Sequence, residues 1–150
     1  MISRILLPHD GTEMSDKAVE KAVELAKALD AELVLLHVIE QIPIPPSIML
    51  GSDPVLIKRA RRSVMRELEQ GWNKLVEIKE HELEKDKVSI TSDCLVGTAS
   101  DQILRYAKTN KSDMIVMASA RLKGLSKIKA LGSVTRKVSE RADCPVLIVH

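Results

Sequence analysis

The chain has 150 residues, of which 45% are hydrophobic and 29% charged, and its formal net charge is +2. These values predict one soluble globular domain over residues 1–150, and the near balance of charges argues against a general nucleic-acid or membrane-surface binder. Trp72 and Tyr106 are its only aromatic residues, so it offers little for stacking on nucleic-acid bases.

The first elements in the sequence are two apolar strands around an amphipathic helix. A short buried strand is predicted at residues 3–7, before a polar turn at His9 and Asp10. Ser15 is the expected N-cap of a helix that runs to about Leu29, and a second strand follows at 32–39. That strand is apolar on both faces, which is typical of a parallel sheet covered by helices on both sides.

The next segment, residues 42–53, is predicted to be a loop that excludes helix, because Pro45 and Pro46 lack N–H donors. Its apolar part, Pro43 to Pro46, is interpreted either as a lid over a site or as a contact surface with another subunit. A long helix is predicted over 54–84, with a basic, solvated opening half and an apolar stripe at Ile57, Ala60, Val64, Leu68, Trp72, Leu75 and Ile78.

Strands are then predicted at 88–96, 113–118 and 145–149, separated by helices at 99–108 and 132–141. The regular alternation of strands and helices predicts a doubly wound α/β fold with a parallel sheet. Cys94 and Cys144 lie in apolar strand-like runs, so we expect buried free thiols. No targeting segment and no membrane-spanning run is recognised, and we expect a cytoplasmic protein without a membrane partner.

Two polar turns are candidates for a ligand site, because ligands of open α/β sheets bind at the carboxyl ends of the strands. In the first turn, Asp10 is either a ligand for ribose or an amine, or a turn residue that caps its own backbone. His9 is either a ligand contact or a strand-end side chain packed under the next loop. In the second, Gly132 and Ser133 either hold phosphate or simply cap a helix, and Arg121, Lys123 and Lys127 either bind phosphates or are solvated.

The sequence contains no pattern that assigns a catalytic reaction. It has no P-loop, dinucleotide fingerprint, nucleophile elbow or zinc-protease motif, and its four histidines show no metal-ligand spacing. We therefore expect a protein that is not an enzyme and has no metal site, with slow nucleotide hydrolysis as a weak alternative.

Several segments together resemble the universal stress protein family over essentially the whole chain. They are Ile5-Leu-Leu-Pro-His-Asp-Gly-Thr-Glu-Met-Ser, Leu33-Val-Leu-Leu-His-Val-Ile, Asp113-Met-Ile-Val-Met, Leu131-Gly-Ser-Val and Cys144-Pro-Val-Leu-Ile-Val. The resemblance implies a five-stranded parallel sheet in the order 3-2-1-4-5 with helices on both faces. It also implies a homodimer formed through the last strand, and binding of AMP or ATP in many members.

The chain departs from the family's nucleotide motif, G-x-x-G-x(9)-G-[ST]. Ala118 and Arg121 stand at the first two glycines, and one extra residue precedes the retained Gly132 and Ser133. The methyl group of Ala118 is expected to be tolerated if its φ is negative, and Arg121 to supply a charge in place of a backbone contact.

Carried over by the resemblance, Pro8, His9 and Asp10 would line the nucleoside end of the site, and Val38 would meet the adenine through its backbone. Ser119, Gly132, Ser133 and Val134 would face ribose and phosphates, and the candidate set also includes Met117, Ala118 and Arg121. The expected function is an adenine-nucleotide-binding regulator of the stress response. The alternative is a dimeric protein-interaction module of the same fold that binds no nucleotide.

Overall fold

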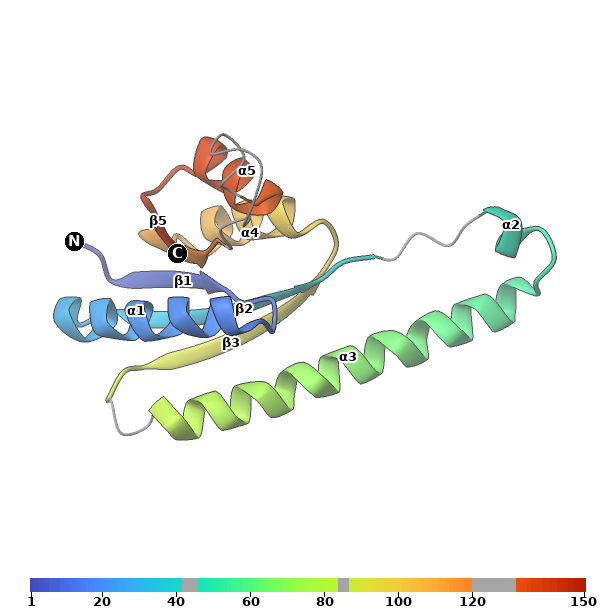
Figure 1. The fold of residues 1–150 in the computed structure, drawn as a ribbon, viewed down its shortest axis with the longest axis horizontal. Coiled ribbons are helices and arrows are strands. Elements are labelled where there is room, and N and C mark those ends of the chain that lie inside the picture. Colours follow the sequence, from blue (N-terminus) through green and yellow to red (C-terminus); the bar gives the residue numbers. More distant parts are fainter. Residues whose placement is uncertain (42–45, 84–86, 120–131) are drawn as a thin grey trace.

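The computed structural model describes residues 1–41, 46–83, 87–119 and 132–150. Five parallel strands form its sheet: β1 (Arg4–Pro8), β2 (Glu32–Ile39), β3 (Ile90–Val96), β4 (Met114–Ala118) and β5 (Val146–Val149). Their spatial order is β3-β2-β1-β4-β5, which confirms the predicted doubly wound α/β fold and strand order (Figure 1).

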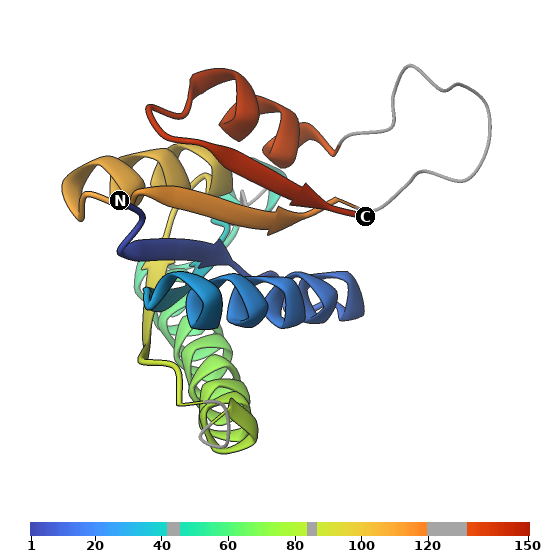
Figure 2. The same ribbon diagram turned by 90° about the vertical axis from the view of Figure 1, so that its left-hand side faces the viewer.

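Helices cover both faces of the sheet, as the continuous apolar strands predicted (Figure 2). On one face, Ile5 and Leu7 of β1 pack with α1 (Glu13–Leu29) and with part of α3 (Pro54–Leu83). On the other face, Leu6 packs with α4 (Ala99–Thr109) and α5 (Ser133–Arg141). Because successive strand side chains point to opposite faces, every residue of the run Ile5-Leu6-Leu7 is fully buried.

Two predictions about local structure are wrong. Ser15 does not cap α1: the N-cap is Thr12, whose Oγ1 accepts the N–H of Ser15 at 3.4 Å. A short helix, α2 (Pro46–Met49), occupies part of the segment that was expected to exclude helix. Pro46 is its first residue, where the N–H would have no partner within the helix, so a proline there costs nothing.

The apolar stripe of α3 is only partly buried. Trp72 is 5% exposed, whereas Val64, Leu68 and Ile78 are 46%, 43% and 59% exposed. The second half of α3 lies along β3, and the first half, which includes Val64, extends past the end of the strands (Figure 1). Ile78 is in the second half but about a third of a turn away from the buried Trp72.

Both cysteines are free, as predicted, but they are half-buried rather than buried. Burial raises the pKa of each thiol above its ordinary value. Within the described ranges, no helix has both the length and the apolar character needed to cross a bilayer.

Candidate functional site

A cavity of about 370 Å³ opens at the carboxyl ends of β1, β2 and β4. It is lined by residues from the first predicted turn and from the ends of β2 and β4, together with the first residues of α4 and α5. Seven residues of the predicted set lie around it: Pro8, His9, Asp10, Val38, Met117, Ala118 and Val134.

The other predicted residues lie beside the cavity or outside the described part of the chain. Ser119 Oγ accepts the N–H of Gly132 at 3.3 Å, which joins the end of β4 to the start of α5. Ser133 is the first residue of α5. Arg121, Lys123 and Lys127 lie outside the described residues, as do Pro43, Ile44 and Pro45 of the predicted lid or contact surface.

One carboxylate oxygen of Asp10 organises the first turn. Its Oδ1 accepts the Thr12 N–H at 3.0 Å, the Thr12 hydroxyl at 2.6 Å and the Ser15 hydroxyl at 2.7 Å. Burial would raise the pKa of Asp10, but these hydrogen bonds outweigh it and hold the pKa below its ordinary value. Oδ1 thus caps the turn, and because the residue is exposed overall, this role is compatible with the interpretation of Asp10 as a ligand contact.

The ring of His9 is committed to the protein itself. Nδ1 accepts the Gly11 N–H at 3.0 Å, so in the neutral ring the proton is on Nε2, which lies 3.1 Å from Asp16 Oδ1. Burial lowers the pKa of His9, against the opposing effect of Asp16, and the residue is only 3% exposed. This geometry supports the interpretation of His9 as a packed side chain.

Seven further residues line the cavity without having been identified from the sequence as site residues: Ser15, Leu36, His37, Glu40, Ala99, Ile103 and Thr135. His37 and Glu40 flank the end of β2, and Ala99 opens the helix after β3. The rule that placed the site at the carboxyl ends of the strands could have pointed to them. Thr135 Oγ1 donates to the Ala118 carbonyl oxygen at 3.1 Å, a contact that depends on how α5 approaches β4.

The N-terminus of α5 suits an anion. A helix N-terminus carries free N–H groups and a partial positive charge, and the N-cap Gly132 adds no side chain in front of it. Ala118 has a negative φ, since the non-glycine residues with positive φ in the described chain are Asp30, Lys87 and Lys111. The alanine at the first motif glycine therefore introduces no backbone strain.

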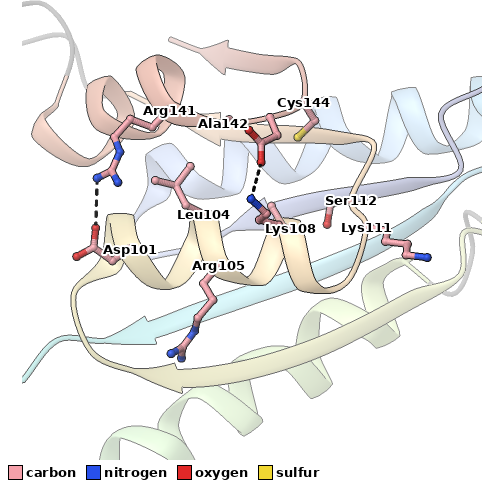
Figure 3. A pocket seen from close by; sticks show the side chains of 11 residues that line it. Asp101, Leu104, Arg105, Lys108, Lys111, Ser112, Arg141, Ala142 and Cys144 are labelled. Atoms are coloured by element: carbon pink, nitrogen blue, oxygen red, sulfur yellow. Dashed lines mark ion pairs between the residues drawn. The ribbon is translucent and has the colours of Figure 1, made fainter.

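A larger cavity, of about 640 Å³, lies along α4 and beside the C-terminal end of α5, away from the predicted site (Figure 3). Its rim carries ion pairs between exposed side chains, with Lys108 Nζ 3.5 Å from Asp143 and Arg141 3.8 Å from Asp101. Cations commonly sit at helix C-termini, where they offset the partial negative charge. This arrangement follows from the helices themselves and does not indicate a ligand. Within the described ranges, no cluster of His, Cys, Asp and Glu side chains is arranged to hold a metal ion.

Comparison with known proteins supports the same fold. The model of the universal stress protein family matches residues 1–150. The universal stress protein YxiE of Bacillus subtilis is 37% identical over 153 residues, which cover 100% of both chains. Universal stress protein MJ0531 of Methanocaldococcus jannaschii is 31% identical over 149 residues, 99% of this chain and 82% of the relative.

Among solved structures, UspA of Lactobacillus plantarum aligns with a TM-score of 0.78 at 21% identity and covers 99% of this chain and 98% of its own. A universal stress protein in complex with cAMP aligns with a TM-score of 0.63 at 21% identity, and the alignment covers 99% of this chain and 97% of that protein's chain. One from Archaeoglobus fulgidus in complex with dAMP aligns at 0.60 and 17% identity, covering 100% of both chains. At these identities the likeness concerns the fold alone.

Proposed function

Because the chain belongs to the universal stress protein family, we propose that its carboxyl-edge cavity binds an adenine nucleotide, AMP or ATP, and that the protein regulates a stress response. The main support is that seven residues chosen from the sequence line one cavity of about 370 Å³. That volume lies at the lower end of the range for small-molecule sites. Family members of the same fold have been solved in complex with cAMP and with dAMP.

In this proposal the nucleotide spans the crevice from β2 to α5. The adenine lies against the backbone at Val38, and the ribose hydroxyls donate to Asp10 Oδ2. The phosphates face the N-terminus of α5 at Gly132 and Ser133, where backbone N–H groups and the helix dipole stabilise negative charge. The role is binding rather than catalysis, since the cavity holds no assigned nucleophile with a neighbouring base.

The placement is tested by a charge at the α5 N-terminus. Among the described residues, a Cβ built at Gly132 meets only Thr135 Oγ1, at 4.0 Å, so Gly132→Glu should fold normally while placing a carboxylate where the phosphates bind. We expect the affinity for AMP or ATP, measured by titration calorimetry, to fall by about tenfold or more, which is about 1.4 kcal/mol. Gly132→Ala is the uncharged control and should keep most of the affinity. Equal affinity in the glutamate variant and the wild type would refute this placement.

A protein-interaction module of the same fold is the second candidate, favoured by the replacement of two motif glycines by Ala118 and Arg121. Native mass spectrometry of the purified chain separates the two. One adenine nucleotide retained per subunit supports the proposed site. A chain that carries none, and whose melting temperature is unchanged by AMP, ADP or ATP, supports the interaction module.

We also propose that the chain forms a homodimer through β5. This strand is at one edge of the sheet, and its four residues are all half-buried, so its open edge can pair with the same strand of a second copy. A native mass that corresponds to a monomer would contradict this assembly.

A further inference from the structure

Three of the exposed apolar residues of α3 lie close to one line along the helix, while Val55 and Leu56 are exposed in its first turn, off that line. Val64, Leu68 and Ile78 are all more than 40% exposed, at 46%, 43% and 59%. Ile57, Val64, Gly71 and Ile78 follow one another at intervals of seven residues, so they lie on nearly one line along the helix. We call this line, together with the adjacent Leu68, the α3 seam.

The α3 seam borders the side of the helix that packs on the sheet: Leu75, which lies on nearly the same line, is partly buried against the core. Successive helical residues are turned by ~100°, which places Trp72 and Val76 about a quarter to a third of a turn away from the seam. These two residues are buried against the sheet, at 5% and 6% exposure. The seam therefore flanks the core contact and continues onto the half of α3 that extends past the strands (Figure 1). Its length from Ile57 to Ile78 is about 30 Å.

The charges of α3 are divided between its two halves. The first half, residues 54–66, contains Lys58, Arg59, Arg61, Arg62 and Arg66 and no acidic residue. The second half, residues 67–83, contains five glutamates and two lysines, which gives it a net charge of −3. A helix with this division complements a second copy of itself that runs in the opposite direction, because each basic half then lies along an acidic half. A parallel pair would place like charges together.

The side chains on the seam fit the same arrangement. In an antiparallel pair centred close to Leu68, Val64 of each copy faces Gly71 of the other, and Ile57 faces Ile78. Gly71 leaves open space, since a Cβ built there meets no atom of residues 1–41, 46–83, 87–119 or 132–150 within 4 Å. The bulk of Val64 can thus enter the gap left by Gly71, and the two helices can approach closely.

We propose that α3 is a self-association surface, on which the α3 seams of two copies of this chain pack antiparallel. The surface lies next to β3, at the opposite edge of the sheet from β5, so the contact leaves β5 free (Figure 2). The proposal is independent of nucleotide binding.

The mass of the full chain in solution tests the proposal. We expect Val64→Glu to lower the mass measured by light scattering to that of the β5 dimer, or to that of the monomer where β5 does not pair, because it places a charge in the centre of the apolar seam. Asn73→Glu adds the same charge to an exposed position on the opposite side of α3 and should leave the mass unchanged. Circular dichroism establishes that both variants are folded. An unchanged mass for folded Val64→Glu would overturn the proposal. A monomeric wild type would overturn it as well, and binding of that monomer to anionic vesicles through α3 would assign the helix to a membrane surface instead.

Disulfide trapping tests the direction of packing independently. In a chain with Cys94→Ala and Cys144→Ala, the double variant Val64→Cys/Gly71→Cys should form a covalent dimer when an oxidant is added. Val64→Cys alone should not, because residues 64 of two antiparallel copies are separated by about 10 Å along the axis, beyond the reach of a disulfide. Efficient crosslinking by Val64→Cys alone, or none by the double variant, would overturn the antiparallel arrangement.

Discussion

Trp72 provides the strongest test of how α3 is attached to the sheet. Its ring stacks on His37 of β2 with a centroid distance of 4.7 Å and an interplanar angle of 17°, and it lies 5.8 Å from the ring of His9. With only 5% of the residue exposed, replacing it by alanine removes nearly all of this contact and leaves a cavity. We expect Trp72→Ala to lower the free energy of unfolding by about 3–5 kcal/mol, the usual cost of removing a buried aromatic side chain. Of this, stacking contributes about 0.5–1.5 kcal/mol.

Urea denaturation followed by circular dichroism measures this loss, since the variant has no tryptophan left for fluorescence. For an m value of about 2 kcal/mol per molar urea, the midpoint should fall by about 1.5–2.5 M. Trp72→Phe keeps a ring against His37 and should lose clearly less, and Asn73→Ala, at an exposed neighbouring position, should change stability by less than about 0.5 kcal/mol. A loss below about 1 kcal/mol for Trp72→Ala would refute the view that this residue anchors α3.

Two further predictions concern protonation and backbone strain. The folded state lowers the pKa of His9 from 6.5, so the unfolded chain takes up the proton first, and the free energy of unfolding should decrease as the pH falls below about 6.5. Urea titrations at several pH values should show that the free energy of unfolding depends less on pH in His9→Gln than in the wild type. An equal pH dependence in the two proteins would contradict the attribution of this effect to His9. Gly97 has φ +146°, and a Cβ there would lie 2.5 Å from Gln102 Nε2, so Gly97→Ala should cost about 1–3 kcal/mol in the same denaturation assay. Measuring Gly97→Ala again in a Gln102→Ala background separates the clash with Gln102 from the backbone strain at residue 97. A loss under about 0.5 kcal/mol for Gly97→Ala alone would be evidence against both the clash and the strain.

The sequence alone determined the strands and their parallel arrangement. Strands that are covered on both faces must be apolar on both, and the run Leu33-Val34-Leu35-Leu36 indicates such a strand in a chain where helices alternate with strands. The position of the candidate site followed from a general property of such sheets, because the carboxyl ends of parallel strands lie at one edge. The strand order came from the family resemblance, since periodicity contains no information on which strands are neighbours.

The tertiary structure decided which atoms remain free for a ligand. The sequence placed His9 and Asp10 at the site, but only the folded turn engages both ring nitrogens of His9 and one oxygen of Asp10 in its own hydrogen bonds. It also decided how much of α3 is buried. Helical periodicity identifies the residues that share a side of the helix, whereas their burial depends on where the neighbouring strands end. Trp72 and Val64 both belong to the apolar stripe predicted from the sequence. Trp72 is buried and Val64 is exposed, because the sheet reaches only Trp72.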